Sequence, residues 1–151
     1  MAAHTDNEIV IDAPIELVWK LTNDVATWPD LFTEYAKAEI LESKGETVRF
    51  RLTMHPDEQG RVWSWVSERT TDPDNWTVKA RRVEPGPFEY MHILWTYDRV
   101  GDTSTRMRWV QDFQMRPDAP LDDEAMARRI NDNSKIQMSI IKDKVEKQAV
   151  A

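Results

Sequence analysis

Apolar and polar residues alternate one by one along most of the central part of the chain. This period-two pattern is typical of β-strands with one buried face. It predicts six strands, over about residues 36–43, 46–55, 60–71, 75–84, 87–99 and 104–115. Turn-forming runs such as Lys44-Gly45-Glu46 separate these segments, and short connections favour antiparallel neighbours. With a further strand over residues 5–12, the pattern predicts a seven-stranded antiparallel sheet.

Three other segments carry helical signals. Short helices are predicted over about residues 16–24 and 29–35, the first with Asp12 as its cap and Pro14 in its first turn. A long helix is predicted over about residues 121–148. Such a helix spans roughly 40 Å, and only the sheet face is available to cover it. The sequence therefore predicts an α+β fold, in which a curved sheet wraps around a long C-terminal helix and two short helices close an interior pocket.

The predicted strand that contains residues 61–69 has an unusual face. Trp63, Trp65, Ser67 and Arg69 share one side of it, at spacings of about 6–7 Å. A solvent-facing strand rarely exposes two tryptophans, and a plain core face rarely buries an arginine. An apolar wall with a few placed polar groups is typical of a small-molecule pocket.

The long helix supports the same interpretation. Its apolar stripe includes Met126, Ile130 and Ile141, but Ser134 and Gln137 interrupt it near the middle. A helix that only packs in a core keeps apolar residues at such positions. Polar residues there predict the lining of a cavity.

Composition narrows the classes of function. The 151 residues are predicted to form one domain, 1–151, with a single core, and 40% of them are hydrophobic. A net charge of −7 argues against a nucleic-acid binder. No apolar run is long enough to span a bilayer, no signal peptide is recognisable, and there is no cysteine. A cytoplasmic protein is therefore expected, without a membrane partner.

No metal site is predicted, because His4, His55 and His92 lack the spacing of metal ligands. The basic residues Lys79, Arg81, Arg82, Arg106 and Arg108 allow two interpretations. They form either a charged outer face of the sheet or a contact for an acidic carrier protein.

Many segments resemble the single-domain aromatase/cyclases of bacterial type II polyketide synthesis, of the tetracenomycin and spore-pigment types, in the Bet v 1-like or START-like (SRPBCC) helix-grip superfamily. The resemblance runs nearly end to end. Its most specific part is Trp63-Ser64-Trp65-Val66-Ser67-Glu68-Arg69 together with Tyr35. Other matching segments are Thr22-Asn23-Asp24, Trp28-Pro29, Leu31-Phe32, Phe50-Arg51-Leu52, Gly86-Pro87-Phe88, Tyr90-Met91 and Met107-Arg108-Trp109.

This resemblance implies a cofactor-independent enzyme in antibiotic or pigment biosynthesis. Its substrate is a poly-β-ketone carried by an acyl carrier protein, and its other partners are components of the type II polyketide synthase. The implied reaction is a regiospecific intramolecular aldol cyclisation, with closure between carbons 9 and 14, followed by dehydration to an aromatic ring. A monomer or weak homodimer is expected.

The resemblance also implies site residues. The implied catalytic residues are Arg69, Tyr35 and Ser67. The implied substrate-binding residues are Trp28, Phe32, Trp63, Trp65, Arg82, Phe88, Met91, Trp95, Trp109 and Gln137. A guanidinium suits an oxyanion because it is always charged and offers several donors. A phenol suits proton transfer, and an arginine beside it is expected to lower its pKa.

Several alternatives remain open from the sequence. Arg69 pairs on the sheet surface with Asp112 or Glu68, or it lies in a pocket. Closure between carbons 7 and 12 is the alternative regiochemistry. A non-catalytic carrier of an apolar ligand, such as a lipid or quinone, is the alternative function. Only the enzyme requires Arg69 and Tyr35 to face the interior.

Overall fold

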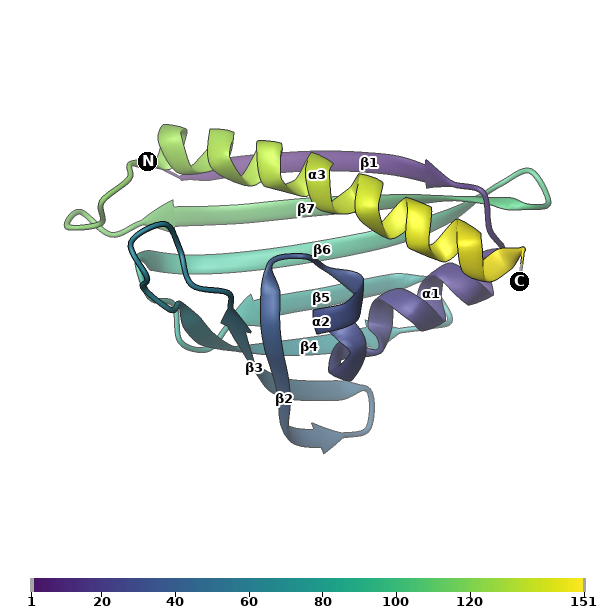
Figure 1. Ribbon diagram of the computed structural model, residues 1–151, viewed down its shortest axis with the longest axis horizontal. Helices are drawn as coiled ribbons and strands as arrows, with labels where there is room; N and C mark the ends of the chain where they lie inside the picture. The colour runs from purple at the N-terminus through teal and green to yellow at the C-terminus, as the bar shows by residue number, and fades with distance from the viewer. Residues whose placement is uncertain (1, 151) are drawn as a thin grey trace.

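The computed structural model describes residues 2–150 and has the predicted order of elements (Figure 1). The helical elements are α1 (Ile15–Asn23), the 3-10 turn η1 (Val25–Thr27), α2 (Trp28–Leu31) and α3 (Asp123–Ala149). The strands are β1 (Ala3–Ile11), β2 (Tyr35–Lys44), β3 (Thr47–Met54), β4 (Ser64–Asp72), β5 (Thr77–Arg82), β6 (Phe88–Val100) and β7 (Ser104–Met115).

The seven strands form one antiparallel sheet in the order β1-β7-β6-β5-β4-β3-β2. Every neighbouring pair except β1 and β7 is consecutive in the chain, as the short turns predict. The sheet curves around α3, while α1 and α2 lie at the open side of that curve (Figure 1). The predicted helix-grip architecture is confirmed.

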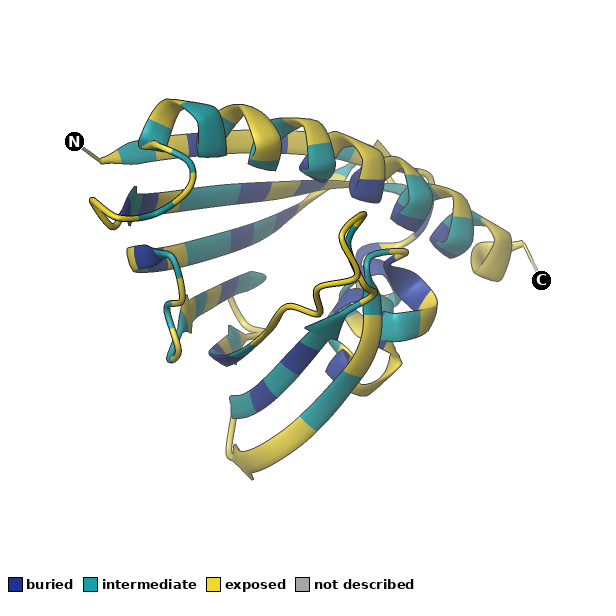
Figure 2. Cartoon of the chain, turned by 60° about the vertical axis from the view of Figure 1, so that its left-hand side comes forward, coloured by how far each residue is buried: buried dark blue, intermediate teal, exposed yellow. Residues whose placement is uncertain are grey.

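Buried residues lie on the inward face of every strand except β2 (Figure 2). On β7 these are Thr105, Met107, Trp109, Phe113 and Met115, and on β6 they include Met91, Trp95 and Tyr97. Met138 and Ile141 are among the residues buried on the face of α3 that packs against the sheet. The space enclosed by the inward faces of the sheet and α3 is called the interior below.

Two details of the sequence prediction are wrong. Asp12 does not cap α1, because Pro14 occupies the cap position and Asp12 accepts a hydrogen bond from the Ser104 hydroxyl instead. The helix predicted over residues 29–35 is only the single turn α2, preceded by η1, because Phe32 is already extended and Tyr35 begins β2.

No helix among residues 2–150 is both long enough and apolar enough to cross a membrane.

Candidate active site

Arg69 lies on β4 with its guanidinium in the interior, and the residue is only 3% exposed. Its Nε and Nη2 donate to Asn23 Oδ1, at 3.2 and 2.7 Å. The guanidinium carbon lies 4.2 Å from the ring centre of Trp95 and 5.1 Å from that of Trp28. The surface pairing with Asp112 or Glu68 is therefore excluded. Among the described residues, no carboxylate forms a salt bridge with Arg69.

Burial lowers the pKa of Arg69 to about 10, so the guanidinium still carries its charge at neutral pH. Asn23 uses two of the five N–H donors of the side chain, and Tyr97 contacts the guanidinium as well. Donors therefore remain for a further acceptor. A buried cation without an anion is a strong electrostatic feature, and it favours any ligand that develops negative charge beside it.

The residues that hold Arg69 in place belong to α1 and β6. The Asn23 Nδ2 donates to the Trp19 carbonyl at 2.9 Å, which turns Oδ1 of the same amide toward the guanidinium. The Tyr97 hydroxyl lies 2.7 Å from Thr22 Oγ1. The sequence analysis gave none of these residues a role, although Thr22-Asn23 belongs to the segments that carry the resemblance and Tyr97 shares the strand face of Trp95.

Replacing Tyr97 with Phe removes the hydroxyl that contacts Thr22, Asn23 and Arg69. We expect a loss of about 1 kcal/mol in the free energy of unfolding, because one buried hydrogen bond is lost. Urea unfolding measures this loss. Tyr90→Phe is the matched control on the outer face of β6, and an equal loss in both variants would contradict the assigned role of the Tyr97 hydroxyl.

Tyr35 begins β2 and lies among aromatic rings. The ring centres of Phe32, Trp28 and Trp65 are 5.1, 6.1 and 6.2 Å from that of Tyr35. Burial, together with the adjacent Glu34, raises the pKa of Tyr35 well above its usual value. Arg82 and Arg69 act in the opposite direction but are outweighed. The expectation of a lowered pKa is therefore wrong, and the phenol keeps its proton at neutral pH.

Glu34 is a titratable group of this site that sequence analysis missed. Its Oε2 accepts a hydrogen bond from Asn133 Nδ2 on α3 at 2.8 Å, and its carboxyl interacts with the Tyr35 phenol. Burial raises the pKa of Glu34, while its hydrogen bonds partly oppose that shift. In the sequence, Glu34 stands directly before Tyr35, within the segment Glu34-Tyr35-Ala36 that also carries the family resemblance.

The raised pKa of Glu34 predicts a pH-dependent stability. Since the folded state binds this proton more tightly than the unfolded state, the free energy of unfolding falls as pH rises from the ordinary glutamate pKa of 4.5 through the raised pKa of Glu34. Glu34→Gln stays neutral and still accepts from Asn133, so it should not show this decrease. Thermal unfolding between pH 4 and pH 8 tests the difference. Glu89→Gln, at an exposed position of β6, is the control, and identical profiles for wild type and Glu34→Gln would contradict the prediction.

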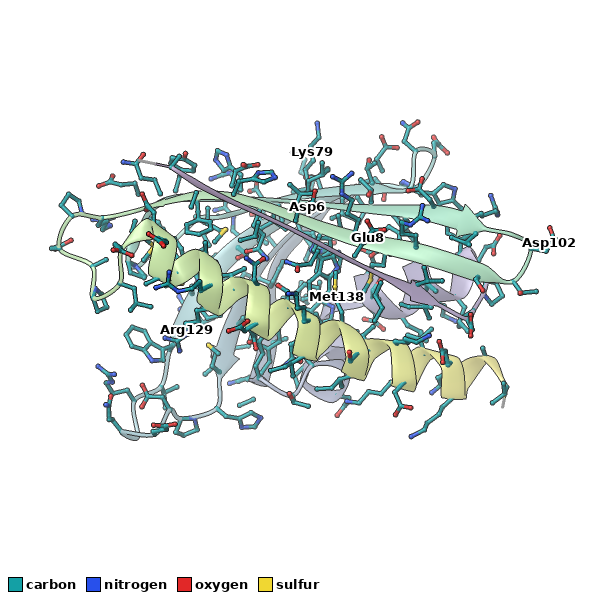
Figure 3. All side chains as sticks on the ribbon, turned by 90° about the horizontal axis from the view of Figure 1, so that it is seen from above. Asp6, Glu8, Lys79, Asp102, Arg129 and Met138 are labelled. Carbon is teal, nitrogen blue, oxygen red and sulfur yellow. The ribbon has the colours of Figure 1, made fainter. Side chains whose placement is uncertain are left out.

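Ser67 and Trp65 share the inward face of β4 with Arg69, as predicted, and Ser67 is buried. Beside them, the Arg82 guanidinium from β5 lies 4.1 Å from the ring centre of Trp65 and 4.7 Å from that of Phe88. Burial lowers the pKa of Arg82 to about 10. The predicted grouping of Arg82 with outer-face cations is therefore wrong, whereas Lys79 does point away from α3 (Figure 3).

Stacked aromatic rings form the rest of the interior wall. Trp95 and Trp109 stack at 4.6 Å between ring centres, Trp28 stacks on Trp95 at 5.9 Å, and Phe32 stacks on Trp109 at 5.9 Å. Met91 is buried on the same face of β6 as Trp95. The sequence-based placement of these residues in the interior is correct.

Part of this interior is accessible to solvent. Tyr35, Trp65, Arg82 and Ile93 face inward but are only partly buried. An inward-facing side chain keeps accessible area only where the space beside it is open. Solvent therefore reaches the part of the interior that holds Tyr35 and Arg82.

Two residues that were predicted to bind substrate, Trp63 and Gln137, have other contacts within the protein. Trp63 precedes β4, is 44% exposed, and its indole donates to Asp57 Oδ2 at 3.0 Å, so its predicted inward placement is wrong. Gln137 is buried on α3, but Thr33 engages both ends of its amide, at 3.1 and 2.9 Å. Gln137 thus ties α3 to the segment after α2.

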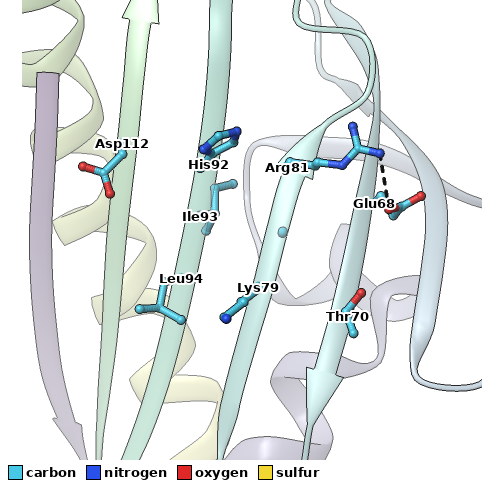
Figure 4. Close-up of a pocket in the computed structure, with 9 residues that line it drawn as sticks. Glu68, Thr70, Lys79, Arg81, His92, Ile93, Leu94 and Asp112 are labelled. Carbon is cyan, nitrogen blue, oxygen red and sulfur yellow. Dashed lines mark hydrogen bonds and ion pairs between the residues drawn. The ribbon is translucent and has the colours of Figure 1, made fainter. Parts of the chain in front are cut away.

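The outer face of the sheet has a hollow of about 380 Å³, lined by Glu68, Thr70, Lys79, Ala80, Arg81, His92, Ile93, Leu94 and Asp112 (Figure 4). Four of its nine lining residues are charged, and Glu68 already pairs with Arg49 and Arg81. It contains none of the interior aromatic rings. Apart from the β6 residue Ile93, the hollow shares none of the residues described above for the interior.

Comparison with known proteins identifies the family of this chain. A family model described as polyketide cyclase / dehydrase and lipid transport matches residues 2–146. A Streptomyces cyaneus protein provisionally named a polyketide cyclase is 60% identical over 146 residues, which cover 97% of this chain and 95% of the relative. A Streptomyces halstedii protein with the same provisional name is 62% identical over 110 residues, covering 73% of this chain and 100% of the relative.

A solved structure has the same fold. The crystal structure of the Zhui aromatase/cyclase from Streptomyces sp. R1128 superposes with a TM-score of 0.87 at 23% identity, covering 98% of this chain and 96% of the other. The family model spans nearly the whole chain, and close relatives share most of its length. This chain therefore belongs to the polyketide cyclase/dehydrase family.

Proposed function

We propose that this protein is a cofactor-independent aromatase/cyclase that folds a poly-β-ketone in its interior and closes the first ring by an intramolecular aldol reaction. One observation carries the proposal: the buried Arg69 guanidinium has no carboxylate partner and is held by Asn23 among stacked tryptophans. Such a group suits a substrate whose oxygens become negatively charged during reaction.

In the proposed reaction, an enol carbon of the substrate attacks a carbonyl carbon. The new C–C bond forms while the carbonyl oxygen takes the electron pair, and Arg69 stabilises this alkoxide. The Tyr35 phenol then donates its proton to the alkoxide, and its raised pKa keeps that proton available. The attacking enol releases its O–H proton as it becomes a ketone, and this proton restores the phenol. The new hydroxyl then leaves with a proton of the adjacent methylene as water, and enolisation of the ring ketones completes the aromatic ring. Ser67, two residues before Arg69 on the same face, binds a neighbouring substrate oxygen.

Positioning of the substrate is the other half of the proposed catalysis. Methylene groups between two ketones are already acidic, so choosing which carbons meet matters more than a strong base. The flat faces of Trp28, Trp95 and Trp109 suit a planar ring as it forms. We propose closure between carbons 9 and 14, with dehydration of the same ring.

The proposed partners are an acyl carrier protein, which delivers the poly-β-ketone, and the other components of a type II polyketide synthase. The test is reconstitution of a minimal synthase with and without this protein, followed by product analysis. We expect the protein to convert a mixture of shunt products into one product with a defined first ring. An unchanged mixture would count against the enzyme.

A non-catalytic carrier of an apolar ligand is the second candidate. The stacked aromatic wall and the lipid-transport members of the family favour it. A carrier copurifies with its lipid or quinone and does not change the product profile. Mass spectrometry of the purified protein, together with the reconstitution, separates the two functions.

A further inference from the structure

A band of polar side chains crosses the interior between two apolar clusters. One cluster contains Phe88, Met91, Phe113 and Met115, with Met126, Ala127 and Ile130 of α3 packed against it. The other includes the tryptophan stack, Met107 and the C-terminal half of α3. The polar band consists of Thr5, Asn7, Gln111, Asn131 and Ser134, which fall between the two clusters along β1, β7 and α3.

Two buried atoms, one in this polar band and one next to it, have no hydrogen-bond partner. They are Thr5 Oγ1 and Trp109 Nε1, and their residues are 2% and 4% exposed. Buried polar groups in folded proteins almost always have a partner, since leaving one unpaired is costly. Asn7 follows that rule by donating to Asn131 Oδ1 at 2.9 Å. The remaining unpartnered atom in the described part of the chain, Arg49 Nε, belongs to a side chain that pairs with Glu68 on the outer face.

The strand register brings the two unpartnered groups together. Thr5 is opposite Gln111 and Asn7 is opposite Trp109, so Thr5 and Trp109 are diagonal neighbours on the inward face of β1 and β7. Their Cβ atoms are therefore about 7–8 Å apart or closer. One ligand oxygen, or two neighbouring oxygens, would satisfy both groups once the side chains beside them move, because neither atom is accessible in this structure.

Their position relative to Arg69 indicates what they bind. Trp109 stacks on Trp95, and Trp95 also carries the Arg69 guanidinium on its ring. Arg69 on β4 and Trp109 on β7 are three strands apart, but both side chains contact Trp95, at 4.2 Å for the guanidinium carbon and 4.6 Å for the Trp109 ring centre, so the two groups lie within about 9 Å of each other. A poly-β-ketone has an oxygen on every second carbon. A chain that places its reacting carbonyl at Arg69 therefore presents further oxygens along this row.

We propose that Thr5 and Trp109 form a second oxygen-binding subsite, which holds a remote carbonyl or enol oxygen of the poly-β-ketone. The indole N–H only donates, so it selects a carbonyl oxygen. The Thr5 hydroxyl donates to a carbonyl or accepts from an enol. By fixing an oxygen far from the reacting carbons, the subsite sets which carbonyl reaches Arg69. The identity of the ligand rests on the proposed function.

The experiment compares two buried threonines of the inward faces. Thr5→Val removes an unpartnered hydroxyl, whereas Thr105→Val removes one that donates to the Ala13 carbonyl at 2.8 Å. The probes are the β-diketone 2-naphthoylacetone and the oxygen-free hydrocarbon 2-butylnaphthalene, and quenching of tryptophan fluorescence measures their binding. Thr105→Val should lower Tm by about 2–4 °C, because a buried carbonyl loses its donor.

We expect Thr5→Val to keep the wild-type Tm and to weaken diketone binding about three- to ten-fold, with hydrocarbon binding unchanged. Trp109→Phe, which keeps an aromatic ring but no N–H, should weaken diketone binding more than hydrocarbon binding. Equal diketone binding by Thr5→Val and wild type would overturn the proposal, as would a wild type that does not prefer the diketone. A Tm loss in Thr5→Val equal to that in Thr105→Val would also overturn it, because the hydroxyl would then have a structural partner such as a buried water.

Failure of the proposed function gives a different result. If the wild type leaves the product profile of a reconstituted synthase unchanged, the cyclase activity is refuted, but the probe measurements still report on the subsite. If the cyclase is active and the subsite exists, Thr5→Val should form ring closures at a second position, whereas Thr105→Val should keep the single closure of the wild type.

Discussion

Arg69→Ala should reduce the rate of ring closure by about 10²- to 10³-fold. This is the usual effect of removing one donor from a site that stabilises an oxyanion. We expect Arg69 to supply much of the stabilisation of the oxyanion, because its charge is buried and its guanidinium has no carboxylate partner among the described residues. Water that fills the vacated space stabilises an alkoxide less well, because its dipoles must reorient during the reaction.

Two further variants separate charge from geometry at this position. Arg69→Lys keeps the charge but loses the planar fork that Asn23 engages through two nitrogens, so most of the rate loss should remain. Arg69→Met keeps much of the volume and removes the charge. If its rate equalled that of the wild type, Arg69 would be a packing residue only.

The matched control for Arg69 is Arg81, which projects from the outer face of β5 and pairs with Glu68. Arg81→Ala should leave both the rate and the product unchanged. Single-turnover measurement of product formation with the reconstituted synthase gives the rates, and circular dichroism confirms that each variant is folded. A rate loss in Arg81→Ala equal to that in Arg69→Ala would show that overall charge, and not the interior site, controls the reaction.

The faces of the strands were predictable because alternation decides them locally. Trp65, Ser67 and Arg69 point inward together, and Phe50 opposes Ser67 on β3, because successive side chains alternate across the sheet. Trp63 breaks the pattern, since Asp57 in the preceding loop accepts from its indole and Arg61 lies over its ring. The alternation of apolar and polar residues in the sequence does not predict such a competing contact.

The partners of the site residues were not predictable in the same way. Asn23 meets Arg69 across 46 positions of the chain, and Asn133 meets Glu34 across 99. These contacts exist only because the sheet curves around α3 and brings α1 beneath it. The direction of the pKa shift of Tyr35 likewise depends on the folded structure. Nearby arginines are visible as residue types, but the burial and the Glu34 carboxyl that outweigh them are properties of the folded interior.

Tyr35→Phe should slow ring formation by about 10²-fold, at the lower end of what a positioned proton donor contributes. The variant keeps the aromatic contacts with Phe32, Trp28 and Trp65, so substrate binding should change little. A fall in kcat with a nearly constant KM is therefore expected. Steady-state kinetics with a carrier-bound or thioester substrate provides both numbers.

The pH dependence tests the same assignment independently. Burial and Glu34 raise the pKa of Tyr35, so the acid stays protonated through neutral and mildly alkaline solution. The wild-type rate should accordingly stay constant between pH 7 and pH 9, with no decline that can be attributed to Tyr35. Had Arg69 and Arg82 lowered this pKa instead, the phenol would lose its proton within that range and the rate would fall. A decline that disappears in Tyr35→Phe would thus overturn the role of Tyr35 as a protonated acid, whereas a flat profile together with the kcat loss supports it.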